Sequence, residues 1–142
     1  MATTRTAKTH WEGSLLEGAG QVALESSGVG TFDVSWASRA NEANGKTSPE
    51  ELIAAAHSAC FSMALSHALA QGGNAPEALD TSADVTFQPG EGITGIKLSV
   101  NGKVPGLTAD QFAEFAEEAK KNCPVSQALA AVPITLDVTF TA

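Results

Sequence analysis

The chain has 142 residues and a mass of 14.5 kDa, the size of a single domain, and folding at this size buries roughly two thirds of the unfolded surface. Its 43% hydrophobic and 17% charged residues exclude a disordered chain, and no run of about 18 apolar residues is present to span a membrane. A formal charge of -8 at pH 7 would repel polyphosphates. We therefore expect one domain, residues 1–142, with neither a nucleic-acid nor a membrane partner.

The first quarter of the chain has the pattern of β structure. Apolar residues recur from Thr9 to about Ala37 between Gly and Ser residues, which predicts a hairpin and one further strand. The polar segment 38–47 contains the turn pair Asn44-Gly45, so it is predicted to be a loop.

A long helix is predicted to begin after this loop. Ser48 and Glu51 have the spacing of a capping box, and Pro49 fits the first helical position. The helix then continues to Gln71 with apolar residues on every side. A helix of this kind is expected in the centre of the molecule.

The second half of the chain predicts a mixture of strands and helices. Thr108 and Gln111 form a second capping box, which opens an amphipathic helix. The order β-β-β-α-β-β-α-α-β predicts an α+β fold, with a mostly antiparallel sheet packed on a long central helix. The elements expected here are strands at 81–87 and 93–104, the amphipathic helix at 108–122, a short helix after Cys123-Pro124, and a final strand at 134–142.

Two cysteines are the first candidates for chemistry. The N-terminal segment lacks the apolar stretch of a secretory signal, so we expect a cytoplasmic protein whose cysteines are thiols at rest. Cys60 lies in the middle of the apolar helix, where it could simply be a core residue. Cys123 precedes Pro124 and would cap the short helix, where N–H groups favour a thiolate. Two such cysteines can also form a transient, catalytic disulfide.

Arg39 and Glu50 are the charged residues of interest. Taken alone, Arg39 is a solvated loop residue and Glu50 an acid that complements the helix dipole. In the functional interpretation, Glu50 holds Arg39 so that the guanidinium faces a cysteine and stabilises its thiolate.

A metal site on the apolar helix is the competing interpretation. His57, Cys60 and His67 share one face of this helix and include ligand types that a soft metal accepts. Ten helical residues span about 15 Å, however, whereas zinc holds its ligands at about 2.0 to 2.3 Å. We therefore expect no metal and no other cofactor.

Several segments together resemble the OsmC branch of the OsmC/Ohr family of thiol peroxidases. The similarity covers nearly the whole chain and is carried by segments of specific sequence. They are His10–Gly13, Thr47–Leu52 (TSPEEL), Ala54–Ser66 (AAAHSACFSMALS), Asn122–Gln127 (NCPVSQ) and Ile134–Asp137.

This resemblance implies an intertwined homodimer that reduces hydroperoxides. Cys60 matches the peroxidatic cysteine and Cys123 the resolving one, which closes an intramolecular disulfide. Arg39 matches the activating arginine and Glu50 its carboxylate partner, although the neighbouring Glu51 is a second candidate. The expected reductant is an external dithiol, with a lipoyl-type dithiol first.

Physical reasoning adds to this picture. A drop in thiol pKa from about 8.5 to about 6 raises the thiolate fraction roughly thirtyfold, and lower nucleophilicity takes back about tenfold, so a placed cation such as Arg39 must supply most of the acceleration. Apolar neighbours such as Phe61 and Met63 favour organic hydroperoxides over hydrogen peroxide. Glu50 lies about 15 Å along the helix from Cys60, so we expect Arg39 and Glu50 to serve the cysteines of a second chain. The alternative function is a redox-sensing or metal-binding dimeric module without turnover, which needs no placed arginine.

Overall fold

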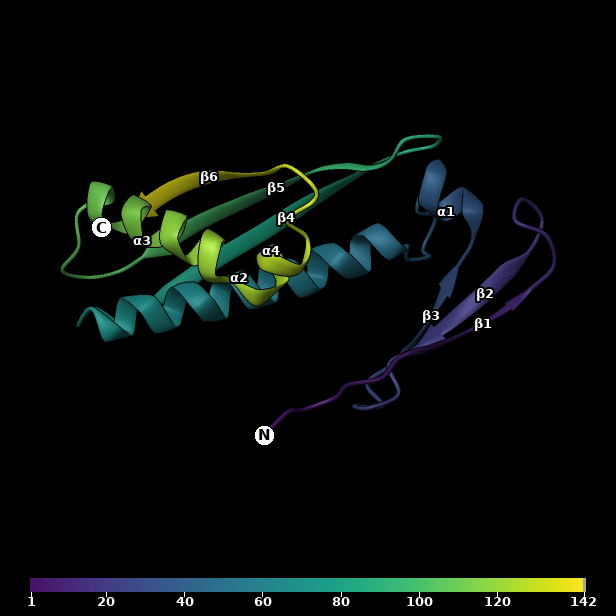
Figure 1. Cartoon of the computed structure of the whole chain (residues 1–142), viewed down its shortest axis with the longest axis horizontal. Helices are drawn as coiled ribbons and strands as arrows, with labels where there is room; N and C mark the ends of the chain where they lie inside the picture. Colours follow the sequence, from purple (N-terminus) through teal and green to yellow (C-terminus); the bar gives the residue numbers. More distant parts are fainter. Residues whose placement is uncertain (142) are drawn as a thin grey trace. The chain divides into compact units, whose positions relative to one another are not determined.

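The computed structural model describes residues 1–141 and divides into two compact units. The first unit is Met1–Leu52 and the second begins at Ile53. The long helix α2 (Pro49–Gln71) contributes its first turn to the first unit and the remainder to the second (Figure 1).

The first unit contains a three-stranded antiparallel sheet followed by a short helix. Strand β2 pairs with β1 on one side and with β3 on the other, so the predicted hairpin and further strand are confirmed. The elements are β1 (Lys8–Glu12), β2 (Ala19–Ala23), β3 (Thr31–Val34) and α1 (Trp36–Ala40).

Helix α1 was not predicted, because residues 38–47 had the composition of a loop. The cause of the helix is a reciprocal cap: the Ser38 N–H donates to Ser35 Oγ (3.1 Å) and the Ser35 N–H donates to Ser38 Oγ (3.0 Å). The prediction of an open loop from residue 38 is therefore wrong, and Arg39 lies on a helical turn.

The second unit packs helices on one face of a second three-stranded sheet. Strands β4 and β5 are antiparallel, whereas β5 and β6 are parallel, which departs from the antiparallel pattern at one pair. The α+β prediction is confirmed. The elements besides α2 are β4 (Ala78–Gln88), β5 (Gly92–Lys103), α3 (Ala109–Asn122), α4 (Pro124–Ala128) and β6 (Ile134–Thr141), and the last residue of the predicted final strand, Ala142, lies outside the described residues.

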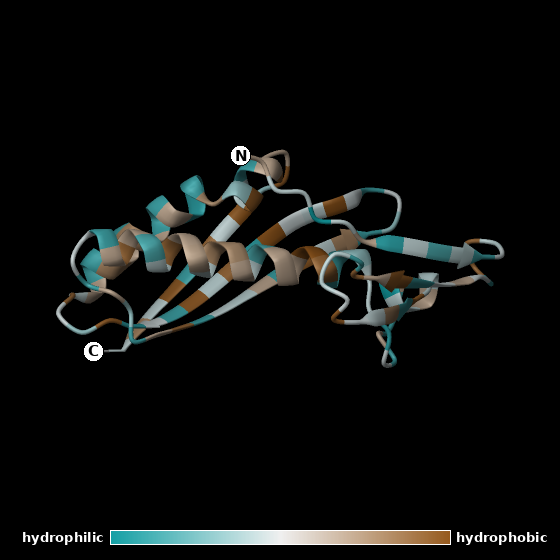
Figure 2. Cartoon of the chain, turned by 90° about the horizontal axis from the view of Figure 1, so that it is seen from below, coloured by the Kyte–Doolittle hydropathy of each residue, from teal (hydrophilic) through white to brown (hydrophobic). Residues whose placement is uncertain are grey.

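One stripe of α2 forms the core with the sheet and α3. Side chains spaced four residues apart along α2 are buried, and so is every second residue in the second half of β5. Apolar and polar residues alternate along the strands in Figure 2. The main members of this core are Phe61, Leu65, Leu69, Leu98, Val100, Val104, Phe112, Ala116 and Ala119.

The opposite side of α2 is apolar but exposed within one chain. Ala55, Ala59 and Met63 lie there, and Met63 is 72% exposed. The helix is also long and apolar enough to cross a membrane by length and composition, although the sequence analysis found no apolar run of that length. The difference arises because Ser62 and other polar residues interrupt the apolar run, while the mean hydropathy of the helix stays apolar. The Ser62 hydroxyl forms a hydrogen bond with Thr81 Oγ1 (2.8 Å) inside the second unit.

Candidate active site

The two cysteines are neighbours in the second unit. Cys60, on α2, is half-buried, and Cys123, which joins α3 to α4, is completely buried. Both are free thiols, and they lie close enough for each to shift the pKa of the other. The predicted pair of cysteines is therefore brought together from different helices.

The surroundings of the two sulfurs shift their pKa values in opposite directions. Burial raises the pKa of the Cys60 thiol; the Val125 N–H donates to this sulfur and opposes the rise, and Cys123 adds to it. Burial also favours a neutral Cys123, but hydrogen bonds from the Ser126 N–H, the Cys60 S–H, the Ser126 O–H and the Val125 N–H outweigh it and lower the pKa of Cys123. The more acidic sulfur is thus the buried one.

His57 and Ser126 lie behind this pair and are themselves buried. His57 is on the buried stripe of α2 with no exposed surface, and its Nε2 lies 2.7 Å from Ser126 Oγ. Its Nδ1 has no hydrogen-bond partner among the described residues. Burial lowers the pKa of His57, so its ring is neutral at neutral pH.

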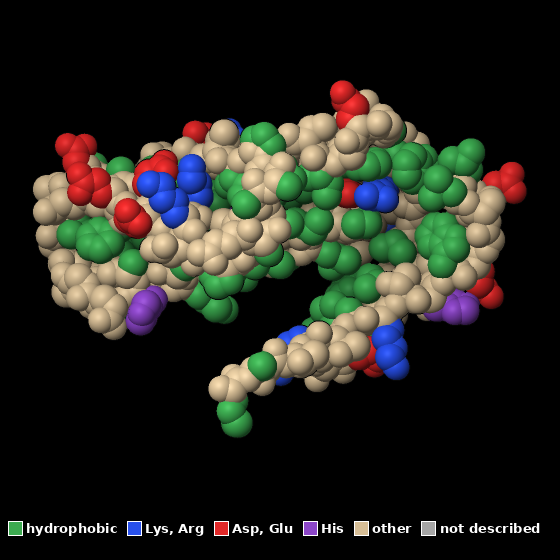
Figure 3. Space-filling view, in the orientation of Figure 1, with side chains coloured by type: hydrophobic (Ala, Val, Ile, Leu, Met, Phe, Trp, Pro, Cys, Tyr) green, Lys and Arg blue, Asp and Glu red, His purple; other side chains and the backbone are tan. Residues whose placement is uncertain are grey.

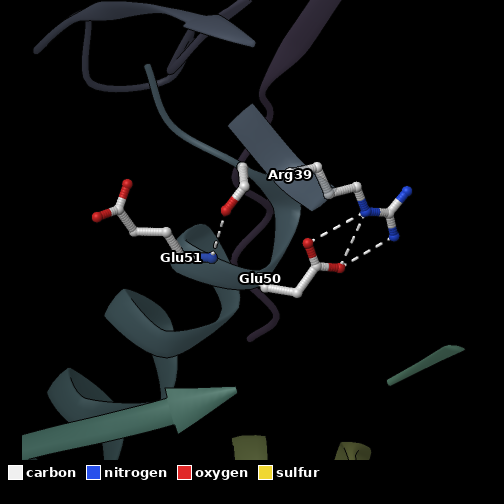
Figure 4. Close-up of polar contacts among 4 residues, drawn as sticks. Arg39, Glu50 and Glu51 are labelled. Carbon is white, nitrogen blue, oxygen red and sulfur yellow. Dashed lines mark hydrogen bonds and ion pairs between the residues drawn. The ribbon is translucent and has the colours of Figure 1, made fainter. Parts of the chain in front are cut away.

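Arg39 and Glu50 form a close ion pair in the first unit. The Arg39 Nε donates to both carboxylate oxygens of Glu50 (3.1 and 3.2 Å), and a terminal guanidinium nitrogen donates to Glu50 Oε2 (2.9 Å). The Glu50 side chain is only 8% exposed, so the carboxylate fixes the guanidinium in one orientation (Figure 4).

Glu51 points away from this ion pair, which decides between the two acids. Its side chain accepts from Thr47 Oγ1 (2.6 Å), and its N–H donates to Ser48 Oγ (3.1 Å), so only half of the predicted capping box forms. Figure 4 shows Glu50 and Glu51 leaving the helix in different directions. Glu50 is therefore the carboxylate that holds Arg39.

An apolar cavity lies beside Arg39 within the first unit. Its volume is about 360 Å³, and apart from the guanidinium its walls are mostly aliphatic and aromatic. A cavity of this size and composition suits the hydrocarbon part of a small molecule. The walls are Thr9, Trp11, Leu15, Val22, Val34, Ser35, Trp36, Arg39, Pro49 and Leu52.

The metal site considered from the sequence has no counterpart in the geometry. His57 forms a hydrogen bond with Ser126, whereas His67 is exposed and lies outside the buried stripe of α2. Within residues 1–141, no group of three or more His, Cys, Asp or Glu side chains is arranged to hold a metal ion.

The structure thus assembles the four predicted residues as two pairs, one in each unit. The sequence analysis missed Ser126, the third residue of the short helix that begins after Cys123, whose N–H and hydroxyl lower the pKa of Cys123. It considered His57 only as a metal ligand.

Known proteins resemble this chain in sequence. The sequence profile of the OsmC family, described as OsmC-like protein, matches residues 42–137. The chain is 43% identical to the peroxiredoxin OsmC of Escherichia coli over 140 residues, which covers 96% of each chain. It is 31% identical to the organic hydroperoxide resistance protein OhrA of Bacillus subtilis over 103 residues, 70% of this chain and 72% of that protein.

A solved structure shows the same fold. The crystal structure of an organic hydroperoxide resistance protein OsmC from Legionella pneumophila aligns with a TM-score of 0.71 and 24% identity, covering 98% of both chains. The profile match, the relative at 43% identity and the shared fold lead to one conclusion: this chain belongs to the OsmC family.

Proposed function

We propose that this chain is a thiol peroxidase for organic hydroperoxides, with Cys60 as the peroxidatic cysteine and Cys123 as the resolving cysteine. The observation that carries the proposal is the contact between two free thiols from different helices. Such a pair can pass from sulfenic acid to disulfide without a large rearrangement. The relatives named peroxiredoxin and organic hydroperoxide resistance protein support the same chemistry.

Access to the sulfur decides the order of the two cysteines. A hydroperoxide must place its terminal oxygen against the attacking sulfur. Cys60 is half-buried and open to an approaching molecule, whereas Cys123 has no exposed surface. Cys60 is therefore oxidised first, and the buried Cys123 then attacks the sulfenic acid of Cys60.

The reaction balances over two steps. The Cys60 thiolate attacks the terminal oxygen, the O–O bond breaks, and the departing alkoxide takes a proton to become an alcohol, which leaves Cys60 as a sulfenic acid. The Cys123 sulfur then attacks Cys60, the S–S bond forms, and the hydroxyl leaves as water. An external dithiol returns two electrons and is itself oxidised to a disulfide.

Arg39 supplies the charge that Cys60 lacks in its own unit. Because burial raises the pKa of Cys60, a cation is needed to favour its thiolate. The guanidinium of Arg39, fixed by Glu50, stabilises the thiolate and then the developing charge on the leaving oxygen.

The working form is a homodimer in which each site takes residues from both chains. Helix α2 runs unbroken from Pro49 to Gln71, so Glu50 and Cys60 are about 15 Å apart along its axis. An isologous contact between two copies of α2 brings the Arg39–Glu50 pair of one copy to the Cys60 of the other. The exposed side of α2, with Ala55 and Ala59, offers a surface where a second helix can approach closely.

The substrate and the reductant follow from the surroundings. The apolar cavity beside Arg39 favours an alkyl or lipid hydroperoxide over hydrogen peroxide. Acidic side chains gather with lysines over α3 (Figure 3), and the chain as a whole carries a charge of -8, which disfavours an anionic reductant such as glutathione. A lipoyl-type dithiol is the expected reductant.

Both units act together as one soluble, cytoplasmic domain. The alignment with the Escherichia coli relative covers 96% of the chain and so includes both units. The polar groups of α2 bond inside the unit, as Ser62 does to Thr81, which is the behaviour of a core helix rather than of a lipid-facing one.

Single-cysteine variants test the proposed roles. Reduced Cys60→Ser should not consume cumene hydroperoxide, whereas Cys123→Ser should consume one equivalent and stop with a sulfenic acid at Cys60, detected by dimedone labelling and mass spectrometry. Wild type should end as the Cys60–Cys123 disulfide. A sulfenic acid that forms on Cys123 in the Cys60→Ser protein at the wild-type rate would reverse the roles.

A further inference from the structure

Four side chains form a continuous line of contacts through the second unit. His57 Nε2 lies 2.7 Å from Ser126 Oγ, Ser126 is the third residue of the helix that begins after Cys123, and hydrogen bonding from Ser126 and Cys60 lowers the pKa of Cys123. His57 and Cys123 have no exposed surface, and Ser126 is buried as well. The reaction as described so far gives no role to His57, a buried titratable residue that is linked to Cys123 through Ser126.

The direction of these hydrogen bonds can be assigned from the proton count. His57 Nδ1 is buried without a partner, so the ring proton is assigned to Nε2, which donates to Ser126 Oγ and leaves the single Ser126 hydroxyl proton for Cys123. His57 is therefore the tautomer protonated on Nε2. Its Nδ1 is then a bare acceptor, which is easier to leave unpartnered in the core than a buried N–H donor.

We propose that His57 and Ser126 are positioning residues for the resolving step: His57 orients the Ser126 hydroxyl, and this hydroxyl holds the Cys123 sulfur as a thiolate directed at Cys60. The proposal rests on the proposed function, in which Cys123 closes the disulfide. The two residues therefore set how long the sulfenic acid of Cys60 survives.

The Ser126 hydroxyl matters most after Cys60 has been oxidised. In the reduced protein, hydrogen bonding from Cys60 is one of the causes that lower the pKa of Cys123. Once Cys60 is a sulfenic acid, its S–H is replaced by an S–O–H group, which departs in the resolving step. The groups that lower the pKa of Cys123 throughout this step are the Ser126 hydroxyl and the N–H groups of Val125 and Ser126.

His57 and Ser126 neither gain nor lose a proton over the whole resolving step. The Cys123 thiol gives up its proton, its thiolate attacks Cys60, the S–S bond forms, and the S–O bond breaks. The hydroxide released takes up one proton and leaves as water. If resolution is slow, a second hydroperoxide oxidises the sulfenic acid to a sulfinic acid and is reduced to its alcohol.

No acid or base from α3 competes with this arrangement in the described part of the unit. The titratable groups that face Cys123 come from α2 and are Cys60 and, through Ser126, His57. The core residues of α3 are apolar. The nearest cations along the chain, Lys120 and Lys121, end α3, where Lys120 donates to the Ile134 carbonyl and Lys121 is exposed.

A pH series of the resolving step tests the proposal. The reduced protein is mixed with one equivalent of cumene hydroperoxide between about pH 5.5 and pH 8.5, quenched with dimedone and N-ethylmaleimide, and analysed by mass spectrometry. Loss of one hydrogen bond to a charged sulfur in Ser126→Ala should raise the pH midpoint of disulfide formation by about one unit and slow it about tenfold below that midpoint. His57→Leu should shift the midpoint in the same direction by a smaller amount.

Conservative variants separate positioning from folding. Ser126→Thr keeps the hydroxyl and should restore the wild-type midpoint, as should His57→Gln in part, because its amide can donate to Ser126. Ser58→Ala is the matched control, since the Ser58 hydroxyl bonds only to the Ala55 carbonyl. With excess hydroperoxide, Ser126→Ala should accumulate about tenfold more sulfinic acid at Cys60 than wild type does.

Two results would overturn the proposal, and a third concerns the function alone. Equal midpoints for wild type, Ser126→Ala and His57→Leu would refute it, as would slower resolution at every pH without a shifted midpoint. If a variant folds poorly, the thiolate absorbance of Cys123 in the Cys60→Ser background gives the same midpoint at equilibrium. If wild type itself forms neither sulfenic acid nor disulfide, the peroxidase function fails.

Discussion

A mixture of two inactive variants tests whether each active site is shared between two chains. Cys60→Ser lacks the attacking sulfur, and Arg39→Ala lacks the cation that activates it. In a dimer with shared sites, a heterodimer of these variants carries both defects in one site and none in the other. Activity should therefore return when the two inactive proteins are unfolded, mixed and refolded together.

The expected recovery can be worked out from the geometry. Arg39 is held within 3.2 Å of Glu50, and Glu50 lies ten helical residues from Cys60, a separation of about 15 Å along α2 and about 80° around it. Arg39 is therefore expected to act on the partner. Equal mixing gives about half heterodimers with one intact site of two, so about a quarter of wild-type activity should return.

A second mixture is the control that distinguishes unshared sites from failed refolding. A chain with both Cys60→Ser and Arg39→Ala, mixed equally with wild type, should give about a quarter of wild-type activity if sites are shared and about half if they are not. Native mass spectrometry confirms that heterodimers form. No recovery from the two single variants, together with half activity in this control, would show that Arg39 serves the cysteine of its own chain.

Three further predictions concern the ion pair, the substrate and the core. Glu50→Gln should slow the oxidation of the peroxidatic cysteine about tenfold in stopped-flow measurements and lower the free energy of unfolding by about 1–2 kcal/mol in urea, because the buried carboxylate carries three hydrogen bonds, whereas Glu51→Gln should leave the oxidation rate unchanged. Cumene hydroperoxide should react faster than hydrogen peroxide, and dihydrolipoamide should reduce the disulfide faster than glutathione; the opposite order in steady-state assays would remove the argument from the apolar cavity. Gly102→Ala should lower the free energy of unfolding by about 1–3 kcal/mol, because an added Cβ would lie 2.2 Å from the Phe112 ring, whereas at Gly95 the nearest atom is 3.9 Å away and Gly95→Ala should have little effect.

Elements with a clear period or cap were predictable from the sequence. The amphipathic pattern and the reciprocal cap of Thr108 and Gln111 placed α3 correctly, and alternation placed β4 and β5 within a few residues. Helix α1 was missed because its cap is a pair of serines, Ser35 and Ser38, in a segment whose composition is that of a loop. Local hydrogen bonding there outweighed composition.

The candidate site was predictable where a motif carried it and not where a distant contact did. Cys60 and Cys123 lie in sequence segments that resemble those of the family. Glu50 and Glu51 could not be separated by sequence, because both follow Pro49 and only the direction of each side chain on the first turn of α2 decides which meets Arg39. The contact between His57 and Ser126 joins residues 69 positions apart, and nothing in the local sequence of either residue signals it.

The more accessible of the two cysteines is not the more acidic one, and this difference affects the order of oxidation and resolution. Cys60 can be reached but its pKa is raised, whereas Cys123 has a lowered pKa but cannot be reached. When the pair shares one proton, these shifts favour the negative charge on Cys123 until a cation beside Cys60 reverses the preference. In the proposed dimer that cation is Arg39 of the second chain. After the attack the charge is again needed on Cys123, where the groups that lower its pKa are already in place. A chain prevented from pairing should then be oxidised slowly yet resolve its sulfenic acid at an undiminished rate, because the cation belongs to the assembly and the resolving thiolate to the chain itself.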